Sequence, residues 1–308
     1  MPDTPVPNAT TTGADDGSPL LDPAVPTRLL VLGLAHRNGD IVTSELWPVT
    51  DACGLSNDQV RSCLRRLVAE GLFSRDGNGR DATLHATAAG RSLLGANTAR
   101  HVLAYAQDAA GRGWHRRWNL VTFAIPESRR AARDHLRDRL LALGAAAVQN
   151  GVYVSPHPWH DEVAEAIDQL ELATYVTMAT TDDLSVGGER DPRRIAAALW
   201  PLEDIAAGYR SFIEVYRDVP DQLDAMRRRG ERLSEADYLP GALHVAIRFN
   251  RCFERDPLLP PELLPRPWPG REARDILARC RRIGVLARQD QKGPALFRVF
   301  DDAIADLP

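Results

Sequence analysis

The chain has 308 residues, 44% of them hydrophobic and 26% charged, which is the composition of a soluble protein with room for two or three domains. No apolar run approaches the length of a membrane-spanning helix, and no secretion signal begins the chain, so we expect a cytoplasmic protein. Its four cysteines lie far apart without a C-x-x-C pair, which argues against disulfides and structural zinc. The net charge of −4 does not favour nucleic-acid binding, but a local basic face decides that question.

The N-terminal region combines a polar tail with two short helices. Residues 1–26 are rich in Pro, Thr, Gly and Asp and have almost nothing to bury, so we expect a disordered tail. Apolar residues from Thr27 then predict a helix that ends near Gly39. A second helix follows over 43–49, and Pro48 should distort its end.

The segment 56–70 has the features of a helix that lies in a DNA groove. Ser56 and Gln59 have the spacing of a capping box, in which each side chain bonds the other residue's backbone amide. One face is apolar and the opposite face is polar and basic, the two sets being Val60, Cys63, Leu64, Leu67 and Val68, and Asp58, Arg61, Ser62 and Arg65. Arg66 lies at the edge, where it can pair with Glu70. The other two arginines are therefore the freer guanidiniums for contact with a base or a phosphate.

A short hairpin follows this helix. Residues 72–75 and 81–85 have strand composition, and the turn between them contains two glycines that allow positive φ angles. Helices followed by such a hairpin predict a winged helix. Thr87 then caps a long helix through about Ala110, on which we expect Arg100 and the adjacent histidine to be solvated.

Side chains of the helix over 56–70 and around the wing turn are candidates for contact with DNA. Arg75 and Arg80 flank the turn and are placed to touch a phosphate or the minor groove, although a plain exposed loop would carry them equally well. The complete predicted set is Ser56, Asn57, Arg61, Ser62, Arg65, Arg66, Arg75 and Arg80. One helix of this length reads only a few base pairs, so we expect a homodimer on a roughly palindromic operator in double-stranded DNA.

From Trp118 onward, strands alternate with helices. We expect strands over 118–125, 145–149, 152–156 and 174–181, and helices over 128–143 and 161–170. Asn150-Gly151 is a strong hairpin signal, and the βαββαβ order is the ferredoxin-like arrangement. Basic residues of the first helix are interleaved with acids, so we favour a salt-bridged surface over a basic binding face for Arg129, Arg130, Arg133, Arg137, Asp134 and Asp138.

The last part of the chain is predicted to be helical. Residues 182–192 form a linker, apolar residues between Leu202 and Tyr216 keep helical spacing, and a helix near Leu239–Arg255 is apolar on most faces. A Pro-rich crossing leads to a last helix over about 271–283. We thus expect an α+β protein with three domains: an N-terminal winged helix-turn-helix with its connecting helix over 27–111, a ferredoxin-like domain over 112–182 and a mostly helical domain over 193–308.

Several motifs are shared with a known family. The most specific is Arg255-Asp256-Pro257-Leu258-Leu259-Pro260-Pro261-Glu262-Leu263-Leu264-Pro265 with Trp268-Pro269-Gly270; others are Gly54-Leu55-Ser56, Trp118-Asn119-Leu120-Val121, Ile125-Pro126-Glu127 and Gly151-Val152-Tyr153-Val154-Ser155-Pro156. From about residue 28 to 285 the chain resembles the PaaX-type repressors of phenylacetate catabolism.

This resemblance implies both a fold and a function. It implies a winged helix, a middle domain similar to the CRISPR-associated Cas2 fold, a helical C-terminal domain, a homodimer, and relief of repression by an aryl-acetyl-CoA thioester. Two departures from the family pattern stand out. Leu84-His85 replaces an expected tyrosine in the wing, which bears on DNA contact, and alanines follow Gly144 where an aromatic residue is expected, which bears on packing or the inducer.

Four polar residues form one stripe on the otherwise apolar helix near 239–255. They fall at i, i+4, i+7 and i+11 and are His244, Arg248, Arg251 and Arg255. Guanidiniums beside apolar side chains would bind the diphosphate of an acyl-CoA thioester such as phenylacetyl-CoA, while the acyl group enters a core pocket. A solvated face, or a salt bridge at a domain interface, would produce the same stripe. We expect no resident cofactor.

The sequence gives weaker support to other classes of function. His157, His160, Asp161 and Glu162 are of metal-binding types, but their spacing fits no known motif, and we expect Asp161 to cap the next helix. In some relatives of the Cas2-like fold a carboxylate at the end of the first strand supports metal-dependent nucleic-acid cleavage; here Glu127 follows a proline, a poor start for two-metal chemistry. A winged helix can also bind protein as an adaptor. No P-loop, G-x-G-x-x-G, G-x-S-x-G or H-E-x-x-H motif occurs, so we predict no enzyme and no metal site.

Overall fold

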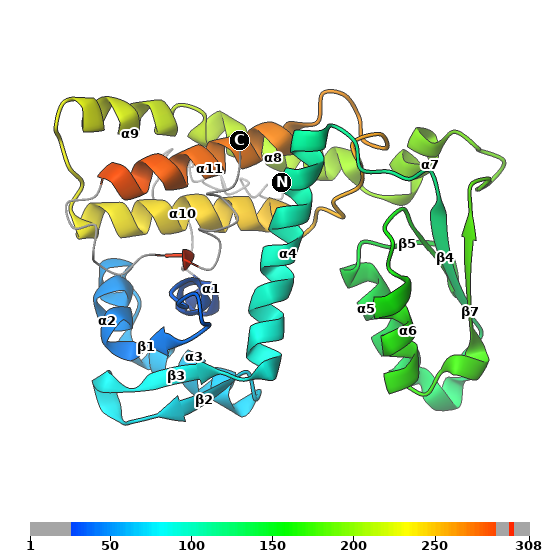
Figure 1. Ribbon diagram of the computed structural model, residues 1–308, viewed down its shortest axis with the longest axis horizontal. Coiled ribbons are helices and arrows are strands. Elements are labelled where there is room, and N and C mark those ends of the chain that lie inside the picture. The colour runs from blue at the N-terminus through cyan, green and yellow to red at the C-terminus, as the bar shows by residue number, and fades with distance from the viewer. Residues whose placement is uncertain (1–25, 288–295, 299–308) are drawn as a thin grey trace, which may run out of the picture.

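The computed structural model describes residues 26–287 and 296–298, which form three groups of helices and strands in chain order (Figure 1). The predicted tail lies outside the described residues apart from Pro26. Within the described part, no helix combines the length and the apolar character needed to cross a membrane. Helices and two small antiparallel sheets together confirm the predicted α+β class.

The first group is a winged helix. Its elements are α1 (Thr27–Gly33), β1 (Ile41–Val42), α2 (Thr43–Ala52), α3 (Asn57–Ala69), β2 (Phe73–Asp76) and β3 (Thr83–Ala86), followed by α4 (Ala88–Ala110). The strands form an antiparallel sheet in the order β1-β3-β2, in which Ile41 and Arg75 both lie opposite Leu84. Thr87 caps α4 as predicted, because its hydroxyl accepts a hydrogen bond from the Gly90 amide.

The first two helices differ in length from the prediction. α1 ends at Gly33 rather than near Gly39, because the chain then turns tightly and the Gly39 amide donates to the His36 carbonyl oxygen at 2.8 Å. α2, in contrast, continues past Pro48 to Ala52. Pro48 is exposed, so water can bind the carbonyl group that the missing N–H leaves unbonded.

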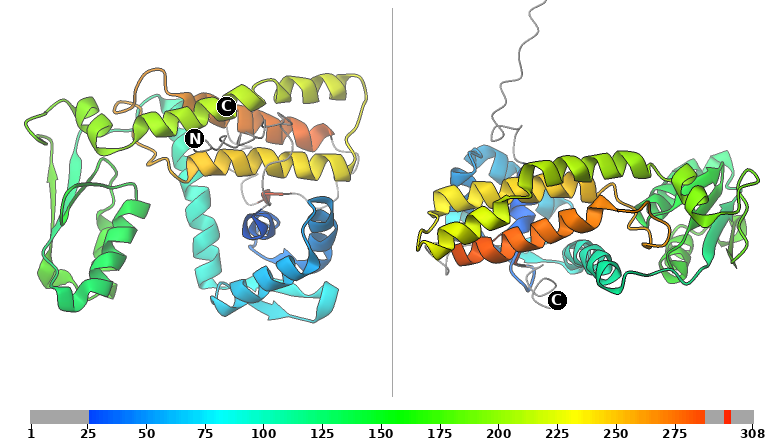
Figure 2. Two further views of the ribbon diagram at one scale, coloured as in Figure 1. Left: turned by 180° about the vertical axis from the view of Figure 1, so that it is seen from behind. Right: turned by 90° about the horizontal axis from the view of Figure 1, so that it is seen from above.

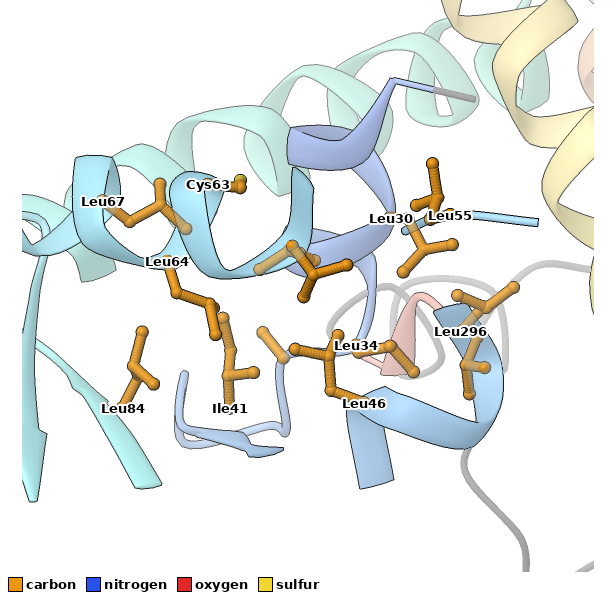
Figure 3. Packing of buried hydrophobic residues seen from close by; sticks show 14 of the residues in the cluster. Leu30, Leu34, Ile41, Leu46, Leu55, Cys63, Leu64, Leu67, Leu84 and Leu296 are labelled. Atoms are coloured by element: carbon orange, nitrogen blue, oxygen red, sulfur yellow. The ribbon is translucent and has the colours of Figure 1, made fainter. Parts of the chain in front are cut away.

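One apolar core holds the winged helix together (Figure 3). It gathers buried side chains from all three helices before the wing and from the sheet, among them Leu30, Leu34, Ile41, Leu46, Leu55 and Leu84. The apolar stripe predicted for α3 contributes Val60, Cys63, Leu64 and Leu67, which are buried. α3 is therefore fixed by one face and presents the other to solvent.

The second group has the predicted βαββαβ order. Its elements are β4 (Trp118–Phe123), α5 (Arg130–Ala142), β5 (Ala146–Gln149), β6 (Val152–Ser155), α6 (His160–Gln169) and β7 (Val176–Thr181). The antiparallel strand order β5-β6-β4-β7 is that of a ferredoxin-like sheet. Gly151 turns the β5–β6 hairpin with φ 73°, and a Cβ there would lie 2.5 Å from the Phe123 carbonyl oxygen, so the turn requires glycine.

The two faces of this sheet pack against different parts of the chain. α5 and α6 cover one face, with buried residues that include Leu136, Leu140, Val163 and Ile167. On the other face Trp118 packs with Ile195 of α7 (Pro192–Leu199) and with Leu259, and its ring stacks on Trp200 with 6.3 Å between centroids. This second cluster attaches the sheet to the helical part of the protein.

Arginines of α5 are paired with acids, as the alternating sequence predicts. Arg130 and Arg133 bind Glu127 with N–O distances of 3.4 and 2.9 Å, and Arg137 binds Asp138 at 3.0 Å. The basic surface of this helix is thereby largely neutralised.

The third group consists of α8 (Leu202–Tyr216), α9 (Val219–Arg228), α10 (Glu235–Phe253) and α11 (Pro269–Ala287). α10 lies between the winged helix and the other long helices of this group (Figures 1 and 2). One side of α10 contributes Leu239, Leu243 and Ile247 to the core of the winged helix. The other side contributes Val245, Phe249 and Phe253 to a core with α8 and α11. A single helix is thus shared by two cores.

A buried charged network joins α4 to the third group. Arg274 of α11, only 4% exposed, contacts Asp108 of α4 through Nε–Oδ2 at 2.5 Å and Nη2–Oδ1 at 2.8 Å. Asp256 lies 3.9 Å from Arg274 and accepts hydrogen bonds at 2.8 Å from the Tyr209 hydroxyl and the Leu258 amide. Burial raises the pKa of Asp256, and Arg274 together with these two hydrogen bonds opposes that shift.

Arg100 and His101 are half-buried and contact the third group, whereas the prediction was that they are solvated. The Arg100 guanidinium donates to the carbonyl oxygens of Phe253 and Asp256 at 3.2 and 2.8 Å. The His101 ring stacks on Phe253 with 4.2 Å between ring centroids. Because the partners of Arg100 lie 153 and 156 residues away along the chain, the pattern of α4 alone could not indicate them.

Replacing Arg274 by Met should lower the free energy of unfolding by about 3–5 kcal/mol, because the buried Asp108 carboxylate loses its counter-charge. Urea unfolding followed by circular dichroism measures the change. Arg271→Met is the matched control, since Arg271 is exposed on the same helix. Equal effects of the two substitutions would show that the network contributes no more than a surface arginine.

The stability of the protein should also depend on pH through His101. Burial, with the nearby Arg281, Arg100 and Arg274, lowers the pKa of His101 from 6.5 to about 3. At a pH between these two values the unfolded chain binds the proton more readily than the folded chain. The contribution of His101 to the free energy of unfolding is therefore fully present above pH 6.5 and is lost as the pH falls. His101→Phe should reduce the difference in urea midpoint between about pH 7.5 and about pH 5. If the difference in urea midpoint is unchanged in this variant, His101 is not the source of the pH dependence.

Candidate nucleic-acid interface and effector stripe

α3 begins with the capping box that the sequence predicts. The Ser56 hydroxyl accepts a hydrogen bond from the Gln59 amide at 3.3 Å, and the Gln59 side-chain oxygen accepts one from the Ser56 amide at 2.9 Å. These bonds satisfy two donors that would otherwise be unpaired, and so fix where the helix begins. Ser56 and Asn57 are both exposed at this end, next to the polar face of the helix.

The polar face of α3 presents arginines with few acidic neighbours. Arg65 and Arg66 are exposed, and within the described part of the chain neither makes an ion pair or a hydrogen bond. The predicted pair of Arg66 with Glu70 is wrong, because Glu70 binds Arg28 of α1 with an N–O distance of 2.8 Å. Ser62, on the same face, is half-buried.

Trp47 of α2 brings the helix and the wing together. Its indole is 6% exposed, and the guanidinium carbons of Arg61 and Arg80 lie 5.8 and 6.0 Å from its ring centroid. Arg61 is also 3.8 Å from Asp58. The backbone of Arg80 is held in place, because its carbonyl oxygen accepts a hydrogen bond from the Thr43 hydroxyl at 2.8 Å.

The structure therefore places Arg61 and Arg80, which the sequence predicts separately, over one ring. The other wing arginine, Arg75, is exposed and donates to the Gly79 carbonyl oxygen at 3.5 Å, within the wing turn. Sequence reasoning did not single out Trp47, since a tryptophan on the apolar side of a short helix has the same pattern as an ordinary core residue.

The predicted effector stripe is shorter than expected. α10 ends at Phe253, so Arg255 lies beyond the helix, and the stripe on the helix consists of His244, Arg248 and Arg251. His244 Nδ1 lies 2.8 Å from the Tyr216 hydroxyl of α8. His244 and Arg248 are half-buried, and Arg251 is exposed. The stripe thus runs from the α8 contact toward the surface.

A separate groove of about 470 Å³ lies between α8 and the start of α11. Its lining includes Arg210, Arg217, Trp268 and Glu272, and no residue of the stripe. Arg210 pairs with Glu203 at 2.9 Å, and Arg217 lies 3.9 Å from Glu272. Guanidiniums beside an indole suit an anionic ligand with an aromatic part, so this groove is a second candidate place for an effector.

The two histidines among the candidate metal ligands have other partners. His157 Nε2 lies 2.9 Å from the Pro257 carbonyl oxygen, and His160 Nε2 lies 3.3 Å from the Thr180 hydroxyl. Asp161 does not cap α6; it lies inside the first turn, after Trp159 at the cap position. In the residues that the structure covers, no group of three or more His, Cys, Asp or Glu side chains could hold a metal ion.

Two family models agree with the middle and last parts of this architecture. The model of the PaaX protein central Cas2-like domain matches residues 111–196, and that of the PaaX-like protein C-terminal domain matches 200–289. The Transcriptional repressor PaaX of Escherichia coli (strain K12) is 24% identical over 243 residues, or 79% of this chain and 74% of that protein. A solved structure, uncharacterized protein Rv0674 from Mycobacterium tuberculosis, aligns with a TM-score of 0.48 and 22% identity over 84% of this chain and 95% of that one.

The structure is that of a winged-helix protein with three parts. In chain order these are the winged helix, a ferredoxin-like sheet with its helices, and a helical bundle. The middle part is the Cas2-like domain that the family resemblance implies, and the last part matches the C-terminal helical domain of the same family. The chain belongs to the PaaX family, as its motifs predict.

Proposed function

We propose that this protein is a DNA-binding transcriptional repressor. The observation that carries the proposal is α3, a capped helix that is fixed by its apolar face and presents Arg65 and Arg66, without acidic partners among the described residues, beside a wing. Similarity to the Transcriptional repressor PaaX of Escherichia coli supports it. Glu127, the candidate nuclease carboxylate, is bound to two arginines, so no observation favours cleavage.

The repressor would act as a homodimer on a roughly palindromic operator. A single recognition helix contacts only a few base pairs, and two half-sites about one helical turn apart supply the remaining specificity. The residues proposed to contact each half-site come from α3, its cap and the wing: Ser56, Asn57, Arg61, Ser62, Arg65, Arg66, Arg75 and Arg80.

Arg65→Ala should weaken operator binding by about 1–3 kcal/mol and reduce discrimination between operator and unrelated DNA, because a base contact is lost. Arg80→Ala should weaken binding to both DNAs alike, because a phosphate carries no sequence information. Fluorescence anisotropy with the DNA upstream of the protein's own gene measures both effects. Arg139→Ala, an exposed arginine of α5, is the control. Wild-type affinity in both test variants would mean that α3 does not contact DNA. An affinity for DNA that does not depend on salt would favour the alternative, a winged helix that binds protein as an adaptor.

We further propose that an aryl-acyl-CoA thioester, with phenylacetyl-CoA as the first candidate, releases the repressor from DNA. The proposed site is the α10 stripe of His244, Arg248 and Arg251, with Arg255 just beyond the helix. Its position supports coupling, because α10 is part of both the winged-helix core and the helical core. Coupling is reciprocal, so operator DNA should lower thioester affinity by the factor by which the thioester lowers DNA affinity.

The variants Arg248→Ala and Arg251→Ala should raise the phenylacetyl-CoA concentration needed for release by about tenfold each, because each loses a charge-assisted contact with phosphate. Calorimetry and release from DNA measure the change. Arg217→Ala, in the groove between α8 and α11, is the matched comparison. If only Arg217→Ala alters the response, the effector site is the groove, and the stripe is a solvated surface.

A further inference from the structure

We propose that Arg61 and Arg80 together bind one phosphate of the DNA backbone, with the Trp47 ring as the floor of the site. The inference rests on the proposed DNA-binding function and deepens it by assigning phosphate contact and base contact to different arginines. The recognition helix and the wing would hold a common phosphate, and Arg65 would be left as the arginine of α3 that reads a base.

Two like charges lie over the ring of Trp47. Both guanidinium carbons lie within 6.0 Å of one ring centroid, although Arg61 comes from α3 and Arg80 from the wing. Each guanidinium is attracted to the face of the indole, but the two cations repel one another. An anion between them removes that repulsion. A phosphate suits the place, because its oxygens accept paired N–H bonds from more than one guanidinium.

The two arginines also have little else to bind. Within the described residues Arg80 makes no ion pair, and its backbone is fixed by the Thr43 hydroxyl. Arg61 has Asp58 at 3.8 Å, but the Asp58 side chain is 95% exposed, and an open pair of that length is easily replaced by a phosphate. The positions of both arginines are therefore set before DNA arrives, while their charge remains available.

The indole contributes its ring face to the site, and not its N–H group. Trp47 Nε1 is buried and has no hydrogen-bond acceptor in the described structure. An indole N–H is only a donor, and a buried donor without an acceptor is costly. The donors that a phosphate can reach are therefore those of the two guanidiniums, and among the described residues the acid in an ion pair with them is Asp58. Phosphate oxygens, which are acceptors only, complement such a group of donors.

The test scans the backbone of a duplex that the wild-type protein selects from random DNA. One phosphate at a time is replaced by a neutral methylphosphonate, and affinity is measured for wild type, Arg61→Ala, Arg80→Ala and, as the control on the same helix, Arg65→Ala. On unmodified duplex each variant should lose about tenfold. At one phosphate of each half-site, the replacement should weaken wild type and Arg65→Ala about tenfold and leave Arg61→Ala and Arg80→Ala unchanged.

Three outcomes overturn the inference. If Arg61→Ala and Arg80→Ala become insensitive at different phosphates, the two side chains do not share a site. If Arg61→Ala changes which bases are selected, Arg61 reads sequence. In both cases DNA binding itself stands. If wild type selects no sequence and shows no salt-dependent affinity for duplex DNA, the proposed function fails and the phosphate site fails with it. Circular dichroism of each variant checks that these exposed substitutions leave the fold intact.

Discussion

The arrangement of the N-terminal and C-terminal parts depends on the two apolar faces of α10. Leu239, Leu243 and Ile247 complete the core of the winged helix, whereas Phe249 and Phe253 complete that of the helical bundle. Fully burying such a side chain stabilises a fold by about 1.5–3 kcal/mol, so neither core can release α10 without a large loss of stability. The winged helix is consequently not a freely tethered module. A ligand that shifts α10 against α8 or α11 acts directly on the packing behind the recognition helix.

The buried network of Arg274, Asp108 and Asp256 adds a second attachment of a different kind. Apolar contacts at α10 are non-directional, whereas the two hydrogen bonds between Arg274 and Asp108 are satisfied in one orientation of α4. A buried ion pair contributes little net stability, because desolvation offsets most of the attraction. We infer that its main effect is geometric: it sets the angle at which α4 leaves the bundle, and so where the other end of α4 holds the wing.

What the sequence predicted and what it missed differ in the range of the contacts involved. Three predicted features depend on residues that are neighbours in the sequence. They are the capping box at Ser56, the hairpin at Gly151 and the βαββαβ order of elements along the middle domain. The partner of Glu70, the burial of Arg100 and the contact of two arginines with Trp47 depend on residues far along the chain. No periodicity encodes those contacts. The sequence indicates that α10 is apolar on most faces. It does not indicate which core each face enters.

Charge pairing explains how a chain with a net charge of −4 can still offer a surface for DNA. The arginine-rich helix α5 is the most basic stretch in composition, yet Glu127 and Asp138 bind its guanidiniums. On α3 the one nearby acid at the helix end, Glu70, is taken by Arg28, which leaves Arg66 beside Arg65 without an acidic partner in the described chain. Water and salt largely screen the interaction between exposed charges that lie more than about 10 Å apart, so a phosphate responds to the local excess of arginine and not to the net charge of the chain. The same pairing that makes α5 neutral is therefore what distinguishes α3 and the wing as the place where DNA would bind.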